Sequence, residues 1–220
     1  MKRFKYPRTY HLPWSPGTTS DDRILKDVSH FVGKKVVVTD KIDGENTSFY
    51  KDHIHARSID SGHHPSRNFV KKIHSEIQHE IPDGFRICGE NVYAKHSIFY
   101  NNLNSYFYVF SIYNEKNTCL SWDETKEISF LLNLKTVPVL YEGIWDEDKI
   151  KSLYTGVSVL GGEQEGYVVR VAESFPYDEQ DKGLNSFFTA KYVREKHVQT
   201  SAHWMNEKVV PNLLGKNEPV

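Results

Sequence analysis

A lysine that could act as a nucleophile stands at the end of an apolar run. The run Val36–Val38 leads into Thr39, Asp40 and Lys41, and Asp43-Gly44 then turns the chain. A lysine at a strand end with a turn directly after it is placed at a cleft rather than on an open surface. Because a protonated amine is a poor nucleophile, we expect partial burial or a neighbouring cation to lower the pKa of Lys41. For this segment alone, the alternative is an ordinary strand that ends in a solvated turn.

Four later segments each combine a charged side chain with a strand-like run. They are His55-Ala56-Arg57, Gly89-Glu90-Asn91, 165–170 and 189–194. Each has a simple alternative: a surface cation at Arg57, a loop charge at Glu90, an acidic patch at 163–165, or a solvated strand residue at Lys191. An ordered set around K-x-D-G is far harder to produce by accident than any one segment. The set therefore indicates one site built from distant parts of the chain.

The elements that must position these side chains are mainly strands. Eight runs rich in Val, Ile, Phe and Tyr predict strands at 35–39, 47–50, 54–57, 85–92, 106–113, 137–141, 166–172 and 187–192. Three helices are predicted between them. Val70, Ile73, Ile77 and Ile81 share one face of a helix that begins near Pro65. Ser121-Trp122-Asp123-Glu124 is a capping box that opens a helix through Leu131, and 147–154 is a shorter candidate. The pattern predicts a mostly antiparallel α+β domain.

Composition limits the partners and the compartment. The chain has 220 residues, a formal net charge of −1 and 26% charged residues, so any basic surface must be local. No apolar run approaches the roughly 20 residues needed to cross a bilayer. The two cysteines, Cys88 and Cys119, form no disulfide framework and no zinc spacing. We therefore expect a cytoplasmic protein without a membrane partner, with a phage gene expressed in a host cytoplasm as one origin.

The motif set resembles the covalent nucleotidyltransferase superfamily of polynucleotide ligases and capping enzymes. The likeness is strongest to its ATP-dependent RNA ligase branch, in the minimal phage and bacterial form. The matching segments are motif I at Lys41–Gly44, motif III at 89–91, motif IIIa at 107–113, motif IV at 165–170 and motif V at 190–194. Segments 7–13, 197–200 and 203–204 also look like segments of small members. The resemblance spans nearly the whole chain.

The resemblance implies a role for each matching residue. Lys41 would attack the α-phosphate of ATP and release pyrophosphate, and Lys191 would neutralise the α-phosphate and help to keep Lys41 deprotonated. Arg57 would hold a phosphate or the ribose. The remaining roles are ribose binding by Glu90, adenine stacking by Phe110, binding of Mg²⁺ or Mn²⁺ by Glu165, and a contact of Asp40 with the base edge.

Two positions depart from the family pattern. Motif V often carries two lysines spaced K-x-K, whereas Thr189 stands at the first position here, so either Lys191 acts alone or Arg194 contributes. Motif IIIa often ends in Phe-Asp-Ile, and this chain has Ser111 in place of the carboxylate.

The stretch after motif V predicts a minimal enzyme. Residues 195–220 are too few for the five-stranded OB-fold that DNA ligases and capping enzymes of the superfamily carry. We therefore expect one nucleotidyltransferase (ATP-grasp-like ligase) domain at 1–220, without an OB-fold and with a short tail at 215–220. The candidate cations for RNA binding are Lys2, Arg3, Lys5 and Arg8 together with the helix cations Arg67, Lys71 and Lys72. The alternative for all of them is a solvated face.

Three functional hypotheses follow. The first is an ATP-dependent RNA ligase that seals 5′-phosphate to 3′-hydroxyl ends in RNA repair, in nicked or structured RNA such as tRNA, with or without an accessory repair protein. The second is a DNA ligase or guanylyltransferase of the same superfamily. The third is a catalytically weak relative that binds RNA ends. The complete set of Lys41, Glu90, Glu165 and Lys191 disfavours the third.

Overall fold

The first of two sheets is built around the strand that carries the candidate nucleophile. In this computed structural model, which describes residues 2–179, 182–197 and 208–215, five strands lie in the order β1-β12-β10-β2-β9. Their bounds are β1 Tyr10–His11, β12 Thr189–Val193, β10 Gly166–Val171, β2 Lys35–Lys41 and β9 Val139–Ile144. Only β1 runs parallel to its neighbour, and the other pairs are antiparallel.

The second sheet follows the path β11-β7-β6-β5-β3-β4, and β8 pairs with β6 beside that path. The bounds are β11 Phe175–Pro176, β7 Thr118–Cys119, β6 Phe107–Tyr113, β5 Arg86–Asn91, β3 Glu45–Tyr50, β4 His53–Ala56 and β8 Lys135–Thr136. Every pair is antiparallel except β6 with β8. The predicted α+β fold with mostly antiparallel sheets is confirmed.

In the described part of the chain, three α-helices lie outside the two sheets. The helix predicted from Pro65 consists of a 3-10 turn at Pro65–Arg67, α1 at Asn68–Ile77 and a second 3-10 turn at Gln78–Glu80. The predicted capping box opens α2 (Trp122–Leu131): the Ser121 hydroxyl accepts from the Glu124 backbone, and the Glu124 carboxylate accepts from the Ser121 backbone. The third helix, α3, covers only Glu147–Lys151, because Ser152 already forms its C-cap.

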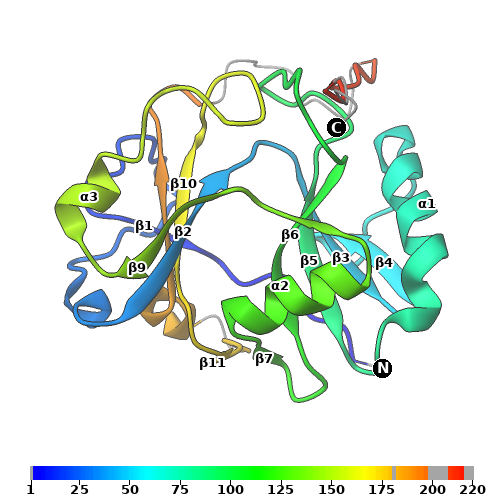
Figure 1. Ribbon diagram of the computed structural model, residues 1–220, viewed down its shortest axis with the longest axis horizontal. Helices are drawn as coiled ribbons and strands as arrows, with labels where there is room; N and C mark the ends of the chain where they lie inside the picture. The colour runs from blue at the N-terminus through cyan, green and yellow to red at the C-terminus, as the bar shows by residue number, and fades with distance from the viewer. Residues whose placement is uncertain (1, 180–181, 198–207, 216–220) are drawn as a thin grey trace.

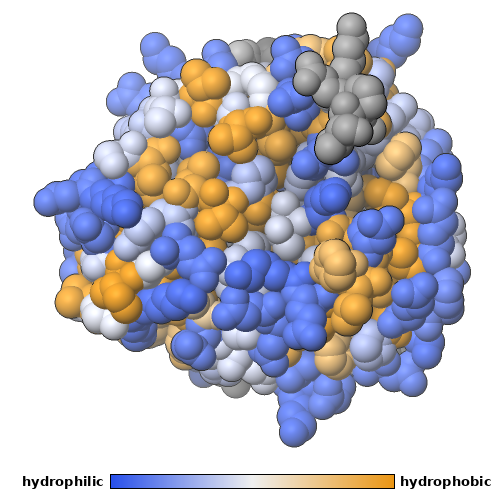
Figure 2. Space-filling view, in the orientation of Figure 1, coloured by the Kyte–Doolittle hydropathy of each residue, from blue (hydrophilic) through white to orange (hydrophobic). Residues whose placement is uncertain are grey.

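The helices cover the outer faces and leave the space between the sheets for side chains. Figure 1 shows α1 beyond β3 and β4, α2 in front of β5 and β6, and α3 beyond β9. Apolar residues of α1 and α2 pack with β3, β5 and β6 in one buried cluster that includes Val70, Phe49 and Ile87. Figure 2 shows hydrophilic residues over α3 and α1 at the two sides and apolar residues gathered across the middle of the same face.

The chain crosses from one sheet to the other directly after Lys41. Strand β2 of the first sheet ends there, and β3 of the second sheet begins at Glu45. The crossing is tight at Gly44, where an added Cβ would lie 2.5 Å from the carbonyl oxygen of Asn91. Asp43 fixes the crossing, since its carboxylate accepts from the backbone of Ser97 at 2.7 Å and of Ile98 at 2.8 Å. This geometry places Lys41 between the two sheets.

Some sequence expectations were incomplete. The two-residue strands β1, β7, β8 and β11 were not predicted, because two residues show no periodicity. Cys88 and Cys119 are buried and free, in agreement with the expected lack of a disulfide framework. No helix in the described parts of the chain combines the length and apolar character needed to span a membrane. The motif-like segments at 198–200 and 203–204 and the tail at 216–220 lie outside the described residues.

Candidate active site

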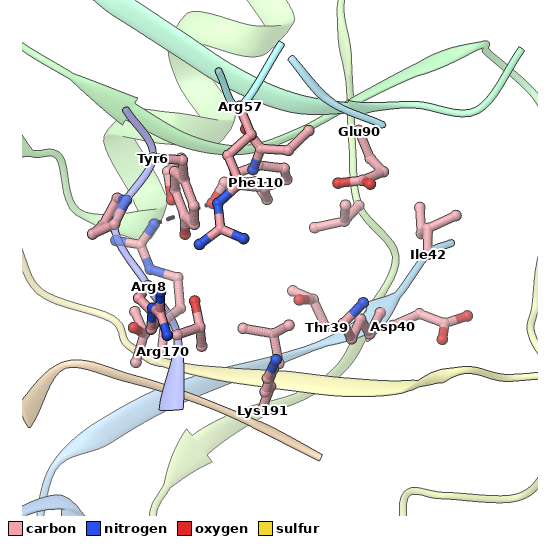
Figure 3. Close-up of a pocket in the computed structure, with 18 of the residues that line it drawn as sticks. Tyr6, Arg8, Thr39, Asp40, Ile42, Arg57, Glu90, Phe110, Arg170 and Lys191 are labelled. Carbon is pink, nitrogen blue, oxygen red and sulfur yellow. Dashed lines mark hydrogen bonds between the residues drawn. The ribbon is translucent and has the colours of Figure 1, made fainter. Parts of the chain in front are cut away.

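A pocket of about 440 Å³ opens between the two sheets. Six of the predicted site residues line it: Asp40, Lys41, Arg57, Glu90, Phe110 and Lys191. Figure 3 shows Arg57, Phe110 and Glu90 on one side of the cavity and Thr39 and Lys191 on the other. Glu90 and Phe110 lie in strands of the second sheet, and Arg57 directly follows the strand β4 of that sheet. Thr39 and Lys191 lie in strands of the first sheet. The fold therefore brings together residues that lie far apart in the sequence.

Glu165, the seventh predicted residue, is joined to the pocket through Lys41. The Nζ of Lys41 lies 2.7 Å from both Oε1 and Oε2 of Glu165. The Glu165 side chain is only 7% exposed and that of Lys41 is 26% exposed. The pair forms because β10 begins at Gly166, which lies opposite Lys41 in β2. A side chain at Gly166 would overlap the carbonyl oxygen of Tyr192, so this position admits only glycine.

The ion pair reverses the expected direction of the Lys41 pKa. Burial by itself lowers the pKa of Lys41, but the carboxylates of Glu165 and Glu90 outweigh it and raise the pKa above its ordinary value. The sequence-based expectation of a lowered pKa was therefore wrong for this arrangement. Lys191, the expected neighbouring cation, does lie in the same pocket, but the two carboxylates dominate.

Lys191 is held by a carboxylate that the sequence did not single out. Its Nζ lies 3.5 Å from Oδ1 of Asp22, and the same oxygen lies 3.2 Å from Nε2 of His11. Burial and the nearby charge of Lys41 lower the pKa of Lys191 despite the carboxylates around it. Of the two pocket lysines, Lys191 is thus the one whose ammonium form is disfavoured.

The support behind Asp22 extends to the backbone of β12. His11 is 1% exposed, and its Nδ1 lies 2.8 Å from Oγ of Ser15. That hydroxyl oxygen accepts from the backbone N–H of Val193 at 2.9 Å. Burial lowers the pKa of His11 to about 4, so the ring is neutral at neutral pH. A buried network therefore links Asp22 to the strand that carries Lys191. The only sequence signal for it was the family-like segment 7–13.

Glu90 faces the two lysines from β5 of the second sheet. Burial raises the pKa of Glu90 to about 8, since the nearby Lys41 only partly offsets it and the carboxylates of Glu165 and Asp43 add to it. The carboxyl group is therefore largely neutral at neutral pH and can donate as well as accept a hydrogen bond. The strand predicted at 85–92 contains Gly89-Glu90-Asn91. In the structure β5 runs through it, and the pairing with β6 shifts register between Cys88 and Gly89.

Arg57 and Phe110 complete the second-sheet side of the pocket. Arg57 follows β4 directly, is exposed, and extends its guanidinium into the cavity (Figure 3). Phe110 in β6 is half-buried and packs edge-to-face on Tyr6, with ring centroids 4.9 Å apart. Tyr6 and Arg8 also line the pocket. Tyr6 was not predicted from the sequence, and Arg8 was predicted only as a candidate cation for RNA binding. The N-terminal segment is therefore part of the site.

Arg194 of motif V and Arg170 of motif IV each have structural partners. Arg194 does not line the pocket, and its Nη2 pairs with Glu163 at 2.6 Å. Of the two alternatives for the missing motif V lysine, the geometry favours Lys191 acting alone. Arg170 is buried, and its Nη2 donates to the carbonyl of Leu120 at 2.7 Å, so it ties β10 to the second sheet.

Asp40 borders the pocket, but its carboxylate is directed into the protein. The residue is 2% exposed, and its Oδ2 accepts from the hydroxyl of Ser158 at 2.6 Å. Burial raises the pKa of Asp40. Its contact with a base edge stays a prediction.

Within the described residues, no group of three or more His, Cys, Asp or Glu side chains is arranged to hold a metal ion. A divalent cation at this site would therefore need oxygen ligands from a bound phosphate in addition to a protein carboxylate. The Glu165 carboxylate fits such a role, since both of its oxygens lie 2.7 Å from the Nζ of Lys41, a residue that lines the pocket.

The sequence and the fold were compared with those of known proteins. The family model described as RNA ligase matches residues 34–193. A comparison with curated proteins finds no match. Among solved structures, Naegleria gruberi RNA ligase with PPi is similar at a TM-score of 0.55 and 19% identity, covering 78% of this chain and 53% of that chain.

Two mutant forms of the same Naegleria gruberi enzyme are similar to about the same degree. A mutant with ATP and Mn gives a TM-score of 0.53 at 20% identity, with 79% of this chain and 54% of that chain covered. A mutant with AMP and Mn gives a TM-score of 0.53 at 20% identity, with 76% of this chain and 52% of that chain covered. The chain thus spans about half the length of the solved structures it matches. At these identities the likeness concerns the fold.

Proposed function

This chain belongs to the RNA ligase family, and we propose that it is an ATP-dependent RNA ligase that carries AMP covalently on Lys41. It would transfer that AMP to a 5′-phosphate RNA end and seal the end to a 3′-hydroxyl. The observation that carries the proposal is the position of Lys41: its amine enters the pocket between the sheets, paired with Glu165 and close to Lys191.

The first step would form the lysyl-AMP. The neutral amine of Lys41 attacks the α-phosphorus of ATP, a P–N bond forms, and the P–O bond to pyrophosphate breaks as pyrophosphate leaves with the electron pair. The ammonium form of Lys41 loses one proton to solvent before the attack, and a second proton leaves the nitrogen to solvent as the P–N bond forms. Lys191, which lies in the same pocket, is placed to stabilise the extra negative charge on the α-phosphate oxygens.

The nucleotide would lie across both sheets. Phe110 offers a ring for stacking on adenine. A contact of Asp40 with the base edge would require its carboxylate to turn from Ser158 toward the pocket. The largely neutral carboxyl of Glu90 can accept from one ribose hydroxyl and donate to another oxygen. The exposed guanidinium of Arg57 suits a phosphate, since its fork matches paired phosphate oxygens.

Mg²⁺ or Mn²⁺ would stabilise the negative charge on the α-phosphate when its phosphorus becomes five-coordinate. Glu165 would hold it together with phosphate oxygens and water. A Glu165 carboxylate that turns its oxygens toward a cation no longer stabilises the ammonium form of Lys41. The pairing seen here therefore supports a protein in which the nucleophile is kept charged until the substrate and the cation arrive. The Mn in structures of the Naegleria gruberi ligase with ATP supports this assignment.

The later steps would reuse the same pocket. The oxygen of a 5′-phosphate RNA end attacks the phosphorus of the lysyl-AMP, and the P–N bond to Lys41 breaks. A 3′-hydroxyl then attacks the activated 5′-phosphate and AMP leaves. We propose that one nucleotidyltransferase domain performs these steps, because both sheets contribute to a single pocket. Nicked or structured RNA, such as tRNA, is the proposed substrate in RNA repair.

The nucleotide that labels the protein is the first test. The protein is incubated with a divalent cation and with ATP or GTP labelled on the α-phosphate, and it is then run on a denaturing gel. We expect a covalent label from ATP that requires Lys41. A label from GTP instead would point to a guanylyltransferase. If neither nucleotide labels the protein, the hypothesis of a catalytically weak protein that binds RNA ends would remain.

The second test uses nicked duplexes in which the residues flanking the nick are ribose or deoxyribose. We expect sealing to require ribose on the 3′-hydroxyl side, since A-form geometry and the 2′-hydroxyl distinguish RNA without base-specific contacts. Equal sealing of an all-DNA nick would overturn the RNA assignment. Adduct formation without closure of any nick would indicate that an accessory repair protein is needed.

A further inference from the structure

A groove of about 700 Å³ opens next to the active pocket and is lined by the N-terminal segment. Its wall carries five cations: Lys2, Arg3, Lys5, Arg8 and Arg57. Arg8 and Arg57, with Tyr6 and Pro7 between the two cavities, line the groove and the active pocket alike. The groove and the pocket are thus neighbouring cavities that share a basic wall.

The acidic residues of the groove do not cancel this charge. Asp178 is buried and accepts from the backbone of Lys182 and Gly183, while Glu179 pairs with Lys2. Among the described residues, Arg3, Lys5, Arg8 and Arg57 form no ion pair with a carboxylate. In a protein whose formal net charge is −1, this is a local concentration of unpaired positive charge beside the active pocket.

The segment that carries these cations is held rigidly. Arg86 is 1% exposed and donates through Nη1 to the carbonyls of Phe4 at 2.9 Å and Lys5 at 3.1 Å. The Tyr177 hydroxyl donates to the carbonyl of Lys5 at 2.8 Å, and the backbone N–H of Phe4 donates to the hydroxyl of Tyr50 at 2.9 Å. Arg86 itself is stacked on Tyr113, 4.1 Å from the ring centroid. The backbone that carries Arg3 and Lys5 is therefore fixed before any ligand binds, which reduces the entropy lost on binding.

We propose that this groove binds the RNA strand that carries the 5′-phosphate and guides it into the active pocket. The inference rests on the proposed function, because the 5′-phosphate must reach the AMP on Lys41. A polyanion that enters the pocket past Arg8 and Arg57 continues into the groove, where Lys5 and Arg3 meet its next phosphates. Repeated phosphates on one chain match a row of fixed cations, and such contacts release counterions on binding.

The structure also disfavours the other candidate surface. Arg67 at the start of α1 is buried and paired through Nε and Nη2 with the carboxylate of Glu45, so it cannot contact RNA. Its prediction as an RNA-binding cation was wrong. On the same helix, Lys72 lies 3.9 Å from Glu76, and Lys71 lies 3.0 Å from a His63 ring nitrogen. Neither Lys71 nor Lys72 lines the active pocket or the groove.

The experiment compares two double charge reversals, R3E with K5E in the groove and K71E with K72E on α1. Each variant and the wild type are measured for lysyl-AMP formation, for binding of a 5′-phosphorylated single-stranded RNA at several salt concentrations, and for thermal stability. We expect the groove variant to lose at least about tenfold in RNA affinity and about one unit or more of salt slope. Its lysyl-AMP formation should stay within about twofold of wild type, because Arg3 and Lys5 do not line the active pocket. The α1 variant should match the wild type in all three.

Several results would overturn the proposal. An unchanged RNA affinity and salt slope in the groove variant would do so, as would an equal loss in the α1 variant. If the groove variant fails mainly in lysyl-AMP formation, Arg3 and Lys5 bind the nucleotide instead of the RNA. If thermal stability falls, the conservative R3K with K5R variant decides, since it must restore RNA binding for the proposal to stand. A wild type that forms no lysyl-AMP but binds RNA through the groove would overturn the proposed function alone.

Discussion

The Nζ of Lys41 lies 2.7 Å from both carboxylate oxygens of Glu165, a residue 124 positions later in the chain. In the proposed function, this pair would keep the nucleophile in its charged, unreactive form until another group takes the carboxylate. Release of the nucleophile would then depend on what binds Glu165. Five predictions follow from this site and from its surroundings.

Replacement of Lys41 by alanine should abolish the covalent AMP label while leaving the fold intact. The amine is the group to which AMP would be attached, so no other side chain can restore the covalent route. The label is measured on a denaturing gel after incubation with labelled ATP. Lys35→Ala is the matched control, because Lys35 begins the same strand but is exposed and pairs with Glu142. A Lys41→Ala protein that is still labelled on another lysine would refute the assignment.

The pH dependence of adduct formation should report the Lys41–Glu165 pair. Because the pKa of Lys41 is raised, the neutral amine is a minor species at neutral pH in the free protein. The single-turnover rate at subsaturating ATP and cation, which reports the free protein, should therefore rise from mildly acidic to alkaline pH. Glu165→Gln removes a carboxylate that raises the pKa, so its rising limb should shift toward lower pH. The plateau rate should nevertheless fall by about 10²–10³-fold, because the charge that would hold the cation is lost.

The control for this profile is Glu163→Gln. Glu163 belongs to the same acidic stretch but is 60% exposed and pairs with Arg194 instead of Lys41. The rising limb of the pH–rate profile of Glu163→Gln should coincide with that of the wild type. If the rising limb of Glu165→Gln stays in place or moves to higher pH, Glu165 does not raise the pKa of Lys41.

Glu90 should tolerate glutamine far better than alanine at neutral pH. Burial raises the pKa of Glu90 to about 8, so the wild-type carboxyl is already mostly neutral, and an amide can replace its hydrogen bonds. We expect Glu90→Gln to keep near wild-type ATP affinity and Glu90→Ala to lose about tenfold, the cost of roughly one hydrogen bond. ATP titrations at neutral and at alkaline pH check this. Equal losses in both variants would mean that the charged carboxylate is required.

Asp22 should act on the reaction through Lys191. Asp22→Asn removes the charge that holds the Lys191 ammonium 3.5 Å away, so the rate of lysyl-AMP formation should fall by about tenfold. The apparent KM for ATP should change little. Asp21→Asn makes the same charge change at the adjacent, exposed residue and should have little effect. Lys191→Ala should be at least as damaging, and the double variant Asp22→Asn with Lys191→Ala should be no worse than Lys191→Ala alone. If the rate losses of the two single variants add up in the double variant, Asp22 affects the reaction independently of Lys191.

Arg67 should matter for stability instead of RNA binding. Arg67→Ala leaves the buried Glu45 carboxylate without its partner, which costs about 3–5 kcal/mol in the free energy of unfolding. Urea denaturation measures this cost. Lys72→Ala, on the exposed face of the same helix, should change stability by less than about 0.5 kcal/mol. A mild Arg67→Ala variant would indicate that Glu45 finds water or another donor.

The sequence by itself determined the local elements and the identity of the motif residues. Alternation and 3.6-residue periodicity arise from which side of a strand or helix is buried, so β2, β6, α1 and the capping box of α2 could all be predicted from neighbouring residues. The ordered set from Lys41 to Lys191 indicated the family for the same reason, since each motif is a short local pattern.

Only the tertiary structure decided how the charges are paired. Asp22 and His11 meet Lys191 because β1 lies beside β12, and Arg67 meets Glu45 because α1 packs on the second sheet. The raised pKa of Lys41 has the same origin: burial alone lowers it, and the sign reverses because Glu165 is brought to 2.7 Å and Glu90 lies nearby. Coulomb energies depend on distance and on the surrounding dielectric, and both are set by segments that are remote in the sequence.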